Sequence, residues 1–357
     1  MFPRTILRIF CAALALGAAA AASAAAPEAA SEAMSGAVQN YDLLLFSDLH
    51  YDRIDLHRPD PKRPFLKEQT RRYSTSWQTE MPRILAAAGK KKFAFPVLLG
   101  DNVEGYFDPP EALAAAMDEL HKLMKEHVSD RYKAVIGNHE YPKITRAVFE
   151  KKAAELGIAP SCNFTFRHGG DLFIVWDDIA ARLQFIEDAL KEAQGARHIF
   201  LLCHLPVLPV GGGSPRWIAF GRPDQDADRK ALLTLLAKHN VIVLCGHFHR
   251  FALSEYVSEE GRITQLMLNS VMDRTSWQTP EAFVMNKEFP FFAQSDFERS
   301  RKPDELRAFL AEYAAGLRES RQFAAYGYVI LHVTQDAVSA DLYSRTDDKP
   351  FAVWKLR

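Results

Sequence analysis

Two stretches of the sequence, LLCHLPV at 201–207 and VIVLCGHFHR at 241–250, share one pattern: an apolar run, a cysteine, and then histidine. The apolar runs predict buried strands. Imidazole side chains at the end of a buried strand do not contribute to its apolar packing. We therefore expect these histidines to interact with residues elsewhere in the chain. The fold decides whether such partners come close to them.

Short apolar runs alternate with helical patterns over the first 250 residues. We expect strands at 41–48, 93–100, 132–137, 172–178, 198–203 and 241–246, and helices near 79–89, 110–127, 145–156, 180–194 and 226–239. This alternation predicts an α/β fold with buried strands.

The pattern changes after residue 250. Longer alternating strands at 250–270 and 326–345 predict a second, antiparallel sheet. Between them, 271–323 is interpreted as an insertion. It contains one amphipathic helix, whose apolar face is formed by Leu306, Leu310, Tyr313 and Leu317.

Composition limits the classes of function. The chain has 357 residues, of which 48% are hydrophobic and 25% charged, enough for one large core or two modest ones. Its formal charge of −1 disfavours a nucleic-acid protein that binds by bulk attraction to phosphates. An anionic substrate would therefore be held by a local site.

The first 26 residues are interpreted as a signal peptide. Arg4 and Arg8 precede an apolar stretch, and Ala22-Ser23-Ala24 suits a cleavage site. We expect a periplasmic or extracellular protein without a stable membrane span, because this alanine-rich stretch is a weak anchor. Residues 27–40, rich in Ala, Ser and Glu, are interpreted as a flexible lead-in.

Three cysteines lie outside the leader, and an odd number does not predict a disulfide framework. Cys203 and Cys245 lie within apolar strand runs, where a thiol is usually a small packed apolar group. That interpretation is favoured over a bridge between the two, which the sequence leaves open.

Polar residues follow five of the predicted strands. Ligands in α/β sheets bind beyond the carboxyl ends of the strands, so these residues are candidates for one site. They are Asp48 and His50; Asp101 and Asn102; Asn138, His139 and Glu140; His204; and His247 and His249.

Each motif is weak alone, but the series D-x-H, G-D-x-x-E, G-N-H-E, H and G-H-x-H resembles the calcineurin-like metallophosphoesterase family over about residues 41–270. The resemblance implies a four-layer α-β-β-α sandwich of two mixed sheets flanked by helices. This domain would cover 41–357, with insertions at 51–78 and 271–323. It also implies a phosphatase or phosphodiesterase.

The family resemblance implies two divalent metal ions. Asp48, His50 and His249 would hold one, Asn138, His204 and His247 the other, and Asp101 would bridge them. Carboxylate oxygen and imidazole nitrogen together suit Zn, Mn, Fe, Co or Ni better than Mg or Ca. A hydroxide between the metals would attack phosphorus, and His139 would protonate the leaving oxygen.

Several neighbouring residues have a less certain role. Glu104 departs from the tyrosine of the G-D-x-x-Y pattern in purple acid phosphatases, which disfavours a tyrosinate–iron site. Glu104, Glu140 and Arg250 are either partners of the metal ligands or ordinary charged residues.

The segment 51–78 is interpreted as a long charged loop that either selects the substrate, with Arg71 and Arg72 as contacts, or is simply solvated. Trp217 follows a glycine-rich bend and is a candidate for closing over the site. The SDLHYD and HLPV stretches also resemble the secreted sphingomyelinase-like branch, although so few residues do not determine the substrate.

Two other functions remain as alternatives. A nuclease of the same fold would need a basic or aromatic strand-binding groove, and the sequence does not identify one, so nucleic acid is an unlikely partner. A binding scaffold that has lost its metals is disfavoured, because all seven ligand positions and His139 are present. The expected partner is a phosphoester substrate, and the oligomeric state is not predicted.

Overall fold

The structure, a computed structural model, describes residues 39–57, 64–141, 145–210, 217–271 and 282–357. All of them belong to one unit of the chain, Ala33–Arg357. The predicted leader and most of the predicted lead-in lie outside these ranges. Within them, no helix combines the length and apolarity needed to cross a bilayer.

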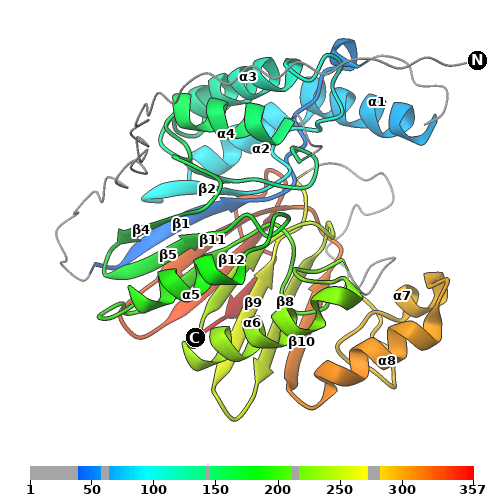
Figure 1. Cartoon of the computed structure of the whole chain (residues 1–357). Coiled ribbons are helices and arrows are strands. Elements are labelled where there is room, and N and C mark those ends of the chain that lie inside the picture. Colours follow the sequence, from blue (N-terminus) through cyan, green and yellow to red (C-terminus); the bar gives the residue numbers. More distant parts are fainter. Residues whose placement is uncertain (1–38, 58–63, 142–144, 211–216, 272–281) are drawn as a thin grey trace, which may run out of the picture. The chain divides into compact units, whose positions relative to one another are not determined.

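The first sheet has six strands in the order β13-β12-β11-β1-β2-β3 (Figure 1). β1 to β3 run parallel, and β11 joins them by pairing antiparallel with β1. The strands are β1 Tyr41–Phe46, β2 Phe95–Leu99, β3 Lys133–Val135, β11 Gly327–Val333, β12 Val338–Ser344 and β13 Ala352–Lys355.

The second sheet has seven strands in the order β10-β8-β9-β7-β6-β5-β4. β5, β6, β7 and β9 run parallel, whereas β4, β8 and β10 pair antiparallel with their neighbours. The strands are β4 Phe164–His168, β5 Asp171–Val175, β6 Ile199–Leu202, β7 Ile242–Cys245, β8 Phe251–Val257, β9 Arg262–Met267 and β10 Leu317–Phe323.

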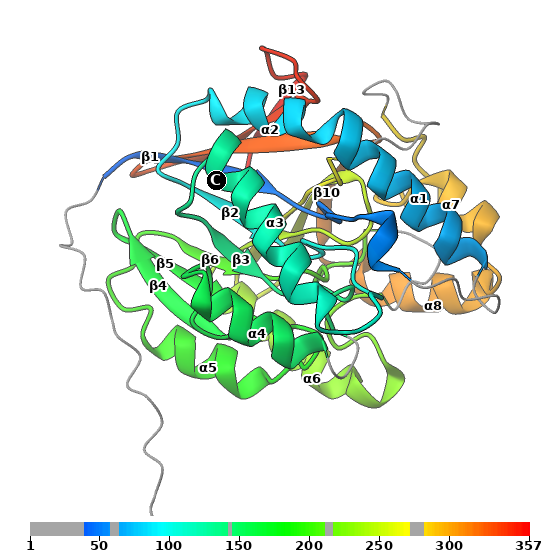
Figure 2. The same ribbon diagram turned by 90° about the horizontal axis from the view of Figure 1, so that it is seen from above.

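Helices cover the outer faces of both sheets, as Figures 1 and 2 show. The first sheet is covered by α1 Pro64–Thr79, α2 Met81–Gly89, α3 Ala112–His127 and α4 Thr145–Glu155; the second by α5 Leu183–Lys191, α6 Asp226–Lys238 and α8 Pro303–Ala314. The short helices are η1 Ile54–Leu56, η2 Pro223–Gln225 and α7 Gln294–Arg299. The predicted four-layer α/β fold of two mixed sheets flanked by helices is confirmed.

Side-chain alternation along β1 explains why the layers form. Leu43 and Leu45 point into the core between the two sheets, whereas Leu44 and Phe46 point to the core beneath the helices. All four are fully buried. Because successive side chains of a strand point to opposite faces, a strand that is apolar at every position must be covered on both.

The prediction of a separate antiparallel second sheet is wrong. The hairpin β8–β9 joins the second sheet through the parallel pairing of β9 with β7, and the hairpin β11–β12 joins the first through β1. Each antiparallel hairpin therefore extends a parallel sheet rather than forming a layer of its own. Hairpin patterns are local in sequence, but the sheet that a hairpin joins is decided by distant strands.

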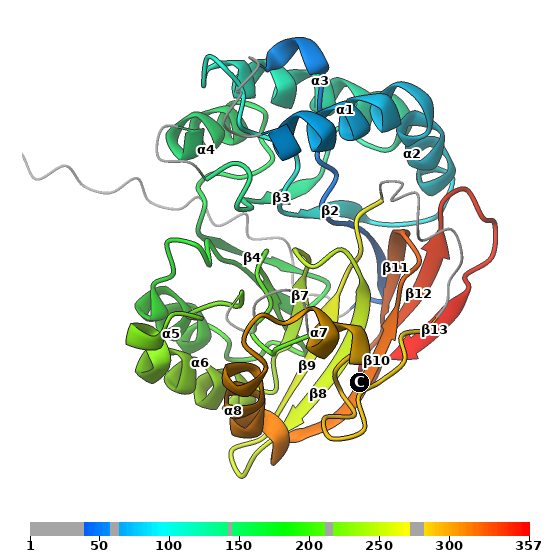
Figure 3. The same cartoon turned by 90° about the vertical axis from the view of Figure 1, so that its right-hand side faces the viewer.

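Both predicted insertions are more ordered than expected. The segment 51–78 was expected to be a loop but contains η1 and most of α1. The segment 271–323 contains α7, α8 and β10, which lie together near β8 in Figure 3. Leu306, Leu310 and Tyr313 are buried on α8 as expected, while Leu317 begins β10.

Cys162, Cys203 and Cys245 are all buried free thiols. The bridge that the sequence left open between Cys203 and Cys245 is therefore not formed here. Burial raises the pKa of both thiols well above the usual value, as expected of packed, unreactive side chains.

Candidate metal centre

The candidate ligands lie where parallel strands of both sheets end. Asp48 and His50 follow β1, Asp101 follows β2, and Asn138 follows β3 in the first sheet. His204 follows β6, and His247 and His249 follow β7 in the second. The structure thus brings together seven side chains that are up to 201 positions apart in sequence.

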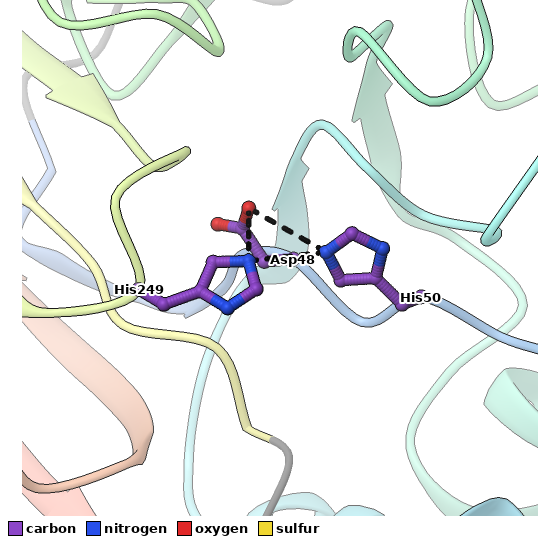
Figure 4. Close-up of side chains that lie close together, drawn as sticks. All are labelled: Asp48, His50 and His249. Carbon is purple, nitrogen blue, oxygen red and sulfur yellow. Dashed lines mark hydrogen bonds and ion pairs between the residues drawn. The ribbon is translucent and has the colours of Figure 1, made fainter. Parts of the chain in front are cut away.

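One cluster is formed by Asp48, His50 and His249, drawn in Figure 4. His249 Nε2 lies 3.2 Å from Asp48 Oδ1, and His50 Nε2 lies 3.9 Å from the same oxygen. The two imidazole Nε2 atoms are 3.1 Å apart. These three atoms can all face one cation, which is the arrangement expected of ligands.

The other cluster is formed by Asp101, His204 and His247. His204 Nε2 lies 3.2 Å from Asp101 Oδ2 and 3.0 Å from Asn138 Oδ1. Burial is the main cause that lowers the pKa of His247 to about 3, and the charge of the nearby His204 is the next. The His247 imidazole is therefore neutral at pH 7, as metal ligation requires.

Asp101 connects the clusters. Its Oδ2 lies 3.2 Å from His204 Nε2 and 3.8 Å from His50 Nε2. Its other oxygen, Oδ1, accepts a hydrogen bond from the backbone N–H of His139 at 2.9 Å, which holds the carboxylate in place. Asp101 is therefore the carboxylate positioned between both groups of imidazoles.

Ligand-capable atoms at the centre lack hydrogen-bond partners. Asp48 Oδ1 and His247 Nε2 are buried and have no hydrogen-bond partner among the residues that the structure describes. A buried polar atom without a partner costs free energy, so such atoms usually have a reason to be there. A cation satisfies both a carboxylate oxygen and an imidazole lone pair, so the residues present fit a metal.

The backbone is strained at the same positions. Asp48, His50, Asp101, His247 and His249 all have φ between 43° and 81°, the left-handed region that non-glycine residues rarely adopt. Each such residue costs on the order of 1–3 kcal/mol, and such strain clusters at functional sites. The tight turns after the strands aim the ligand side chains at one point.

Two glycines make room for the ligands. A Cβ on Gly246 would lie 1.8 Å from Ser47 Oγ and 2.5 Å from Asp48 Oδ2. A Cβ on Gly100, which has φ 88°, would lie 2.5 Å from His204 Nδ1. Any larger residue at either position would push a candidate ligand out of place.

Hydrogen bonds at Nδ1 fix the tautomers of two histidines. His50 Nδ1 donates to Glu104 Oε2 at 2.8 Å, and His204 Nδ1 donates to the Leu99 carbonyl at 2.9 Å. When the ring is neutral, each bond leaves the Nε2 lone pair directed at the cluster. Glu104, whose role the sequence left open, is thus a direct partner of a candidate ligand.

His139 belongs to neither of these two clusters, although its imidazole lies close to ligand-capable atoms of His50 and Glu104. Its Nδ1 donates to the Glu104 carbonyl at 2.7 Å, and its Nε2 lies 3.9 Å from Asp101 Oδ2. Burial alone would lower the pKa of His139, but the carboxylates of Asp101 and Glu104 raise it well above its usual value. The imidazole is held so that Nε2 can present a proton to the cavity.

Glu140 and Arg250 support the site at a distance. Glu140 accepts hydrogen bonds from the backbone of Val103 and Gly137, which ties two ligand loops together. Arg250 turns away from the ligands and forms a buried pair with Asp296, at 3.0 and 3.1 Å. Neither side chain bonds directly to a candidate ligand, so the interpretation of these two residues as partners of the metal ligands is not supported.

A cavity of about 640 Å³ opens beside both clusters. Trp217, expected to close over the site, lines this cavity, with its ring 5.6 Å from that of His247. Arg71 and Arg72 do not line it: Arg71 is exposed on α1, and Arg72 lies over the Tyr73 ring at 5.4 Å. These two arginines therefore lie outside the cavity lining, contrary to their predicted role as substrate contacts.

The helix α1 instead supports the loop that carries His50. The ring of Tyr73 stacks on the His50 imidazole at 4.7 Å. Trp77 Nε1 donates to the backbone carbonyls of Leu49 and His50, each at 3.0 Å. Sequence reasoning missed this role, although Tyr73 and Trp77 have the i, i+4 spacing of one helix face.

Asp178 is a site residue that sequence reasoning missed. It follows β5, is 2% exposed, lines the cavity and accepts a hydrogen bond from the Leu205 backbone. Burial raises its pKa to about 8. The signal was available, because an acid after an apolar strand is the same pattern that identified the other candidates.

A family model described as calcineurin-like phosphoesterase matches residues 41–251. Among solved structures, the chain is similar to PhoD (11% identity, TM-score 0.54, covering 90% of this chain and 70% of that one). It is also similar to a dimetal phosphatase from Danio rerio (13% identity, TM-score 0.53, covering 88% of this chain and 98% of that one). A third similar structure is a purple acid phosphatase from yellow lupin seeds (12% identity, TM-score 0.52, covering 90% of this chain and 54% of that one).

This chain thus spans about half the length of the lupin enzyme. At these identities the structural likeness establishes a shared fold. A search of curated proteins gave no significant match.

Proposed function

The chain belongs to the calcineurin-like phosphoesterase family and is a metal-dependent phosphoesterase, and from this premise we propose an exported hydrolase that uses two divalent metal ions. The observation that carries the proposal is the position of Asp101 Oδ2 between His204 Nε2, at 3.2 Å, and His50 Nε2, at 3.8 Å. A carboxylate that reaches both clusters can bridge two metals.

Seven residues would hold the metals. Asp48, His50 and His249 would bind the first, Asn138, His204 and His247 the second, and Asp101 both. Mixed oxygen and nitrogen ligands favour Zn, Mn, Fe, Co or Ni. When bound, the two ions would supply a water acidic enough to act as nucleophile near pH 7 and positive charge for the phosphate oxygens.

Binding of the second metal has to displace a proton. Burial alone would lower the pKa of His204, but the Asp101 carboxylate, together with Asp48 and Asp178, raises it to about 10. A ligating imidazole must be neutral, so metal uptake at this position releases a proton and strengthens as pH rises.

His139 would assist the leaving group. The hydrogen bond from its Nδ1 to the Glu104 carbonyl keeps Nε2 facing the cavity, and the neighbouring carboxylates favour the protonated ring. A protonated imidazole in that position can donate Nε2–H to the oxygen that leaves phosphorus. Because Asp101 also ligates metal in this proposal, part of its effect on His139 would be lost in the loaded enzyme.

The direct test is reconstitution. Metal-free protein is loaded separately with Zn, Mn, Fe, Co or Ni, its metal content is measured, and hydrolysis of phosphomonoesters and phosphodiesters is followed. We expect turnover that rises to a maximum at two ions per chain. Hydrolysis at full rate with one ion per chain would contradict the two-metal proposal, and metal binding without any hydrolysis would favour a binding scaffold.

A matched control tests whether loss of a carboxylate outside the two clusters also affects metal binding and turnover. Asp304→Asn removes an exposed carboxylate of α8 that pairs with Arg307 and lies outside the centre. It should bind metal and turn over like the unmodified protein.

Export rests on the interpretation of residues 1–26 as a leader. The basic start at Arg4 and Arg8 and the Ala22-Ser23-Ala24 site support it. Fractionation of cells that make the full chain, with the N-terminus of the mature protein determined, tests it. A cytoplasmic protein that begins at Met1 would contradict export.

A further inference from the structure

The cavity beside the metal clusters has two kinds of lining. One is polar and includes five candidate ligands together with His139, Asp178, Arg222 and Gln225. The other is apolar and consists of Tyr73, Tyr106, Ile179, Leu205, Trp217, Ile218 and Phe220. The polar lining alone would suffice for a phosphate, so the apolar lining is available to contact another part of a substrate.

Two of the apolar residues are unusually exposed. Trp217 is 56% exposed and Tyr106 is 38% exposed, and both belong to the five large hydrophobic side chains most open to solvent among the described residues. Each ring stands beside a site histidine: Trp217 is 5.6 Å from His247, and Tyr106 is 5.2 Å from His139. Exposed apolar surface of this kind is typical of ligand sites.

The wall that carries Trp217 is preformed. Its ring stacks on that of Phe248, with 6.4 Å between centroids and 18° between planes. Ile218 and Phe220 are 3% and 4% exposed, and Phe220 packs on the buried Trp176 at 5.7 Å. A ring fixed in this way can receive a flat or bulky apolar group without first becoming ordered.

Positive charge is scarce along the apolar lining. Of the described residues that line the cavity, Arg222 is the only arginine or lysine, and it pairs with Asp224 at 3.3 Å. A leaving group with further phosphates would find few cations there. The described part of the lining therefore fits an uncharged group.

We propose that the leaving alcohol of the natural substrate carries an aromatic or bulky apolar group, which packs against Trp217 and Tyr106. This proposal rests on the phosphoester hydrolysis proposed above. Water forms the new bond to phosphorus, the bond from phosphorus to the alcohol oxygen breaks, and that oxygen takes a proton. A cavity of about 640 Å³ is in the range that holds a ligand of this size.

The test compares two esters whose leaving alkoxides have similar basicity: 2-(2-naphthyl)ethyl phosphate and ethyl phosphate, each also as its methyl diester. The metal-loaded enzyme should have a kcat/KM at least about tenfold higher for the naphthyl member, given the value of aromatic packing. Trp217→Ala should remove most of that preference through KM, so that the naphthyl member loses more of its kcat/KM than the ethyl member, while Trp217→Phe should keep part of the preference. Equal kcat/KM for both esters would overturn the proposal, as would an equal loss for both in Trp217→Ala.

Val284→Ala is the matched control, because Val284 is 78% exposed and lies outside the cavity. It should leave both esters unchanged. A loss of the naphthyl preference in this variant would overturn the assignment to Trp217 and Tyr106.

Binding gives a readout that does not depend on turnover. The hydrolysis-resistant 2-(2-naphthyl)ethylphosphonate should bind about tenfold more tightly than ethylphosphonate by calorimetry, and Trp217→Ala should abolish the difference. If the phosphonates behave so but no ester is hydrolysed, the apolar site stands and the proposed hydrolysis fails. If esters are hydrolysed but the phosphonates bind equally, the hydrolysis stands and the substrate class is wrong.

Discussion

The two clusters of candidate ligands are supported in different ways. In the first, appended helices fix the histidines: α1 holds the His50 loop through Trp77, and α7 holds Arg250, the residue after His249, through Asp296. In the second, the strand framework itself does so, since His204 Nδ1 donates to the carbonyl of Leu99 at the end of β2. The alternating core therefore builds one cluster, and the added segments complete the other.

If each cluster binds one metal, as proposed, this difference implies that the two metal affinities can be changed separately. Groups that orient ligands typically change metal affinity or activity by about 10- to 100-fold when they are removed. Changes in α1 or α7 should weaken the first cluster alone, whereas a change at Asp101 should affect both. The variants below test how far the separation holds, from the largest expected effect to the smallest.

Asp101→Asn should nearly abolish turnover and reduce metal content below two ions per chain. The amide cannot supply the negative charge that faces both His50 and His204. Metal analysis and steady-state kinetics check this. Full metal content with an unchanged rate would contradict a bridging role for Asp101, and it would also contradict the proposal that the two clusters form one centre.

His139→Ala should keep both metals and lower the rate with alkyl phosphoesters by ~10²–10⁴-fold, the usual contribution of a general acid. Nitrophenyl esters should lose much less, because their leaving oxygen needs no proton. A uniform loss across leaving groups would instead assign His139 to stabilising charge in the transition state. Loss of metal would make it part of a cluster.

Asp296→Asn should weaken the first metal by about 10- to 100-fold and spare the second. It removes the charge that pairs with the buried Arg250, so the turn that carries His249 loses its support. Titration of metal-free protein with one metal should show one affinity falling and the other unchanged. An equal fall in both would show that α7 supports the fold rather than one cluster.

Trp77→Phe should have a smaller effect on the same cluster. The ring volume is largely kept, but the carbonyls of Leu49 and His50 lose a donor, which costs about 1–3 kcal/mol of unfolding free energy for a buried acceptor. Chemical denaturation and the metal titration measure both effects. If the protein is destabilised but the metal affinity of the first cluster is unchanged, α1 does not control the position of His50.

His332 shows what a histidine held by carboxylates does away from the clusters. Burial lowers its pKa, but hydrogen bonds with Asp42 and Asp341, at 2.7 and 3.2 Å, raise it overall. The contribution of protonated His332 to the stability of the folded state is therefore complete below the pKa of the unfolded chain, about 6.5. It is lost as the pH rises through the pKa of His332 in the folded protein. His332→Gln should flatten this small part of the pH dependence of unfolding, with or without metal.

The sequence contained most of the site, because parallel strands deliver their carboxyl ends to one edge. Asp48, His204 and His247 could be recognised by what precedes them, a buried apolar run. Arg250 could not be placed in the same way: it directly follows a ligand, yet its side chain turns to a partner 46 residues further on. Contacts between distant segments leave no local pattern.

The fold shows the same limit. The hairpins at 250–270 and 326–345 could be recognised, but not the sheets that they join. The helix α1 was hidden because PFLKEQTRRYSTSWQT is mostly polar, and its buried face rests on few residues such as Tyr73 and Trp77. A helix with so few apolar residues on its buried face carries a weaker apolar signal than its neighbours on the same sheet.

The pairing of β1 with β11 sets the order in which the protein can be completed. β1, which leads into Asp48 and His50, has β2 on one side but must wait for residues 327–333 on the other. In a chain made from its N-terminus, that contact spans almost the whole length of synthesis, and such long loops close slowly. A chain cut short before Gly327 would leave one edge of β1, the strand that leads into Asp48 and His50, without its partner.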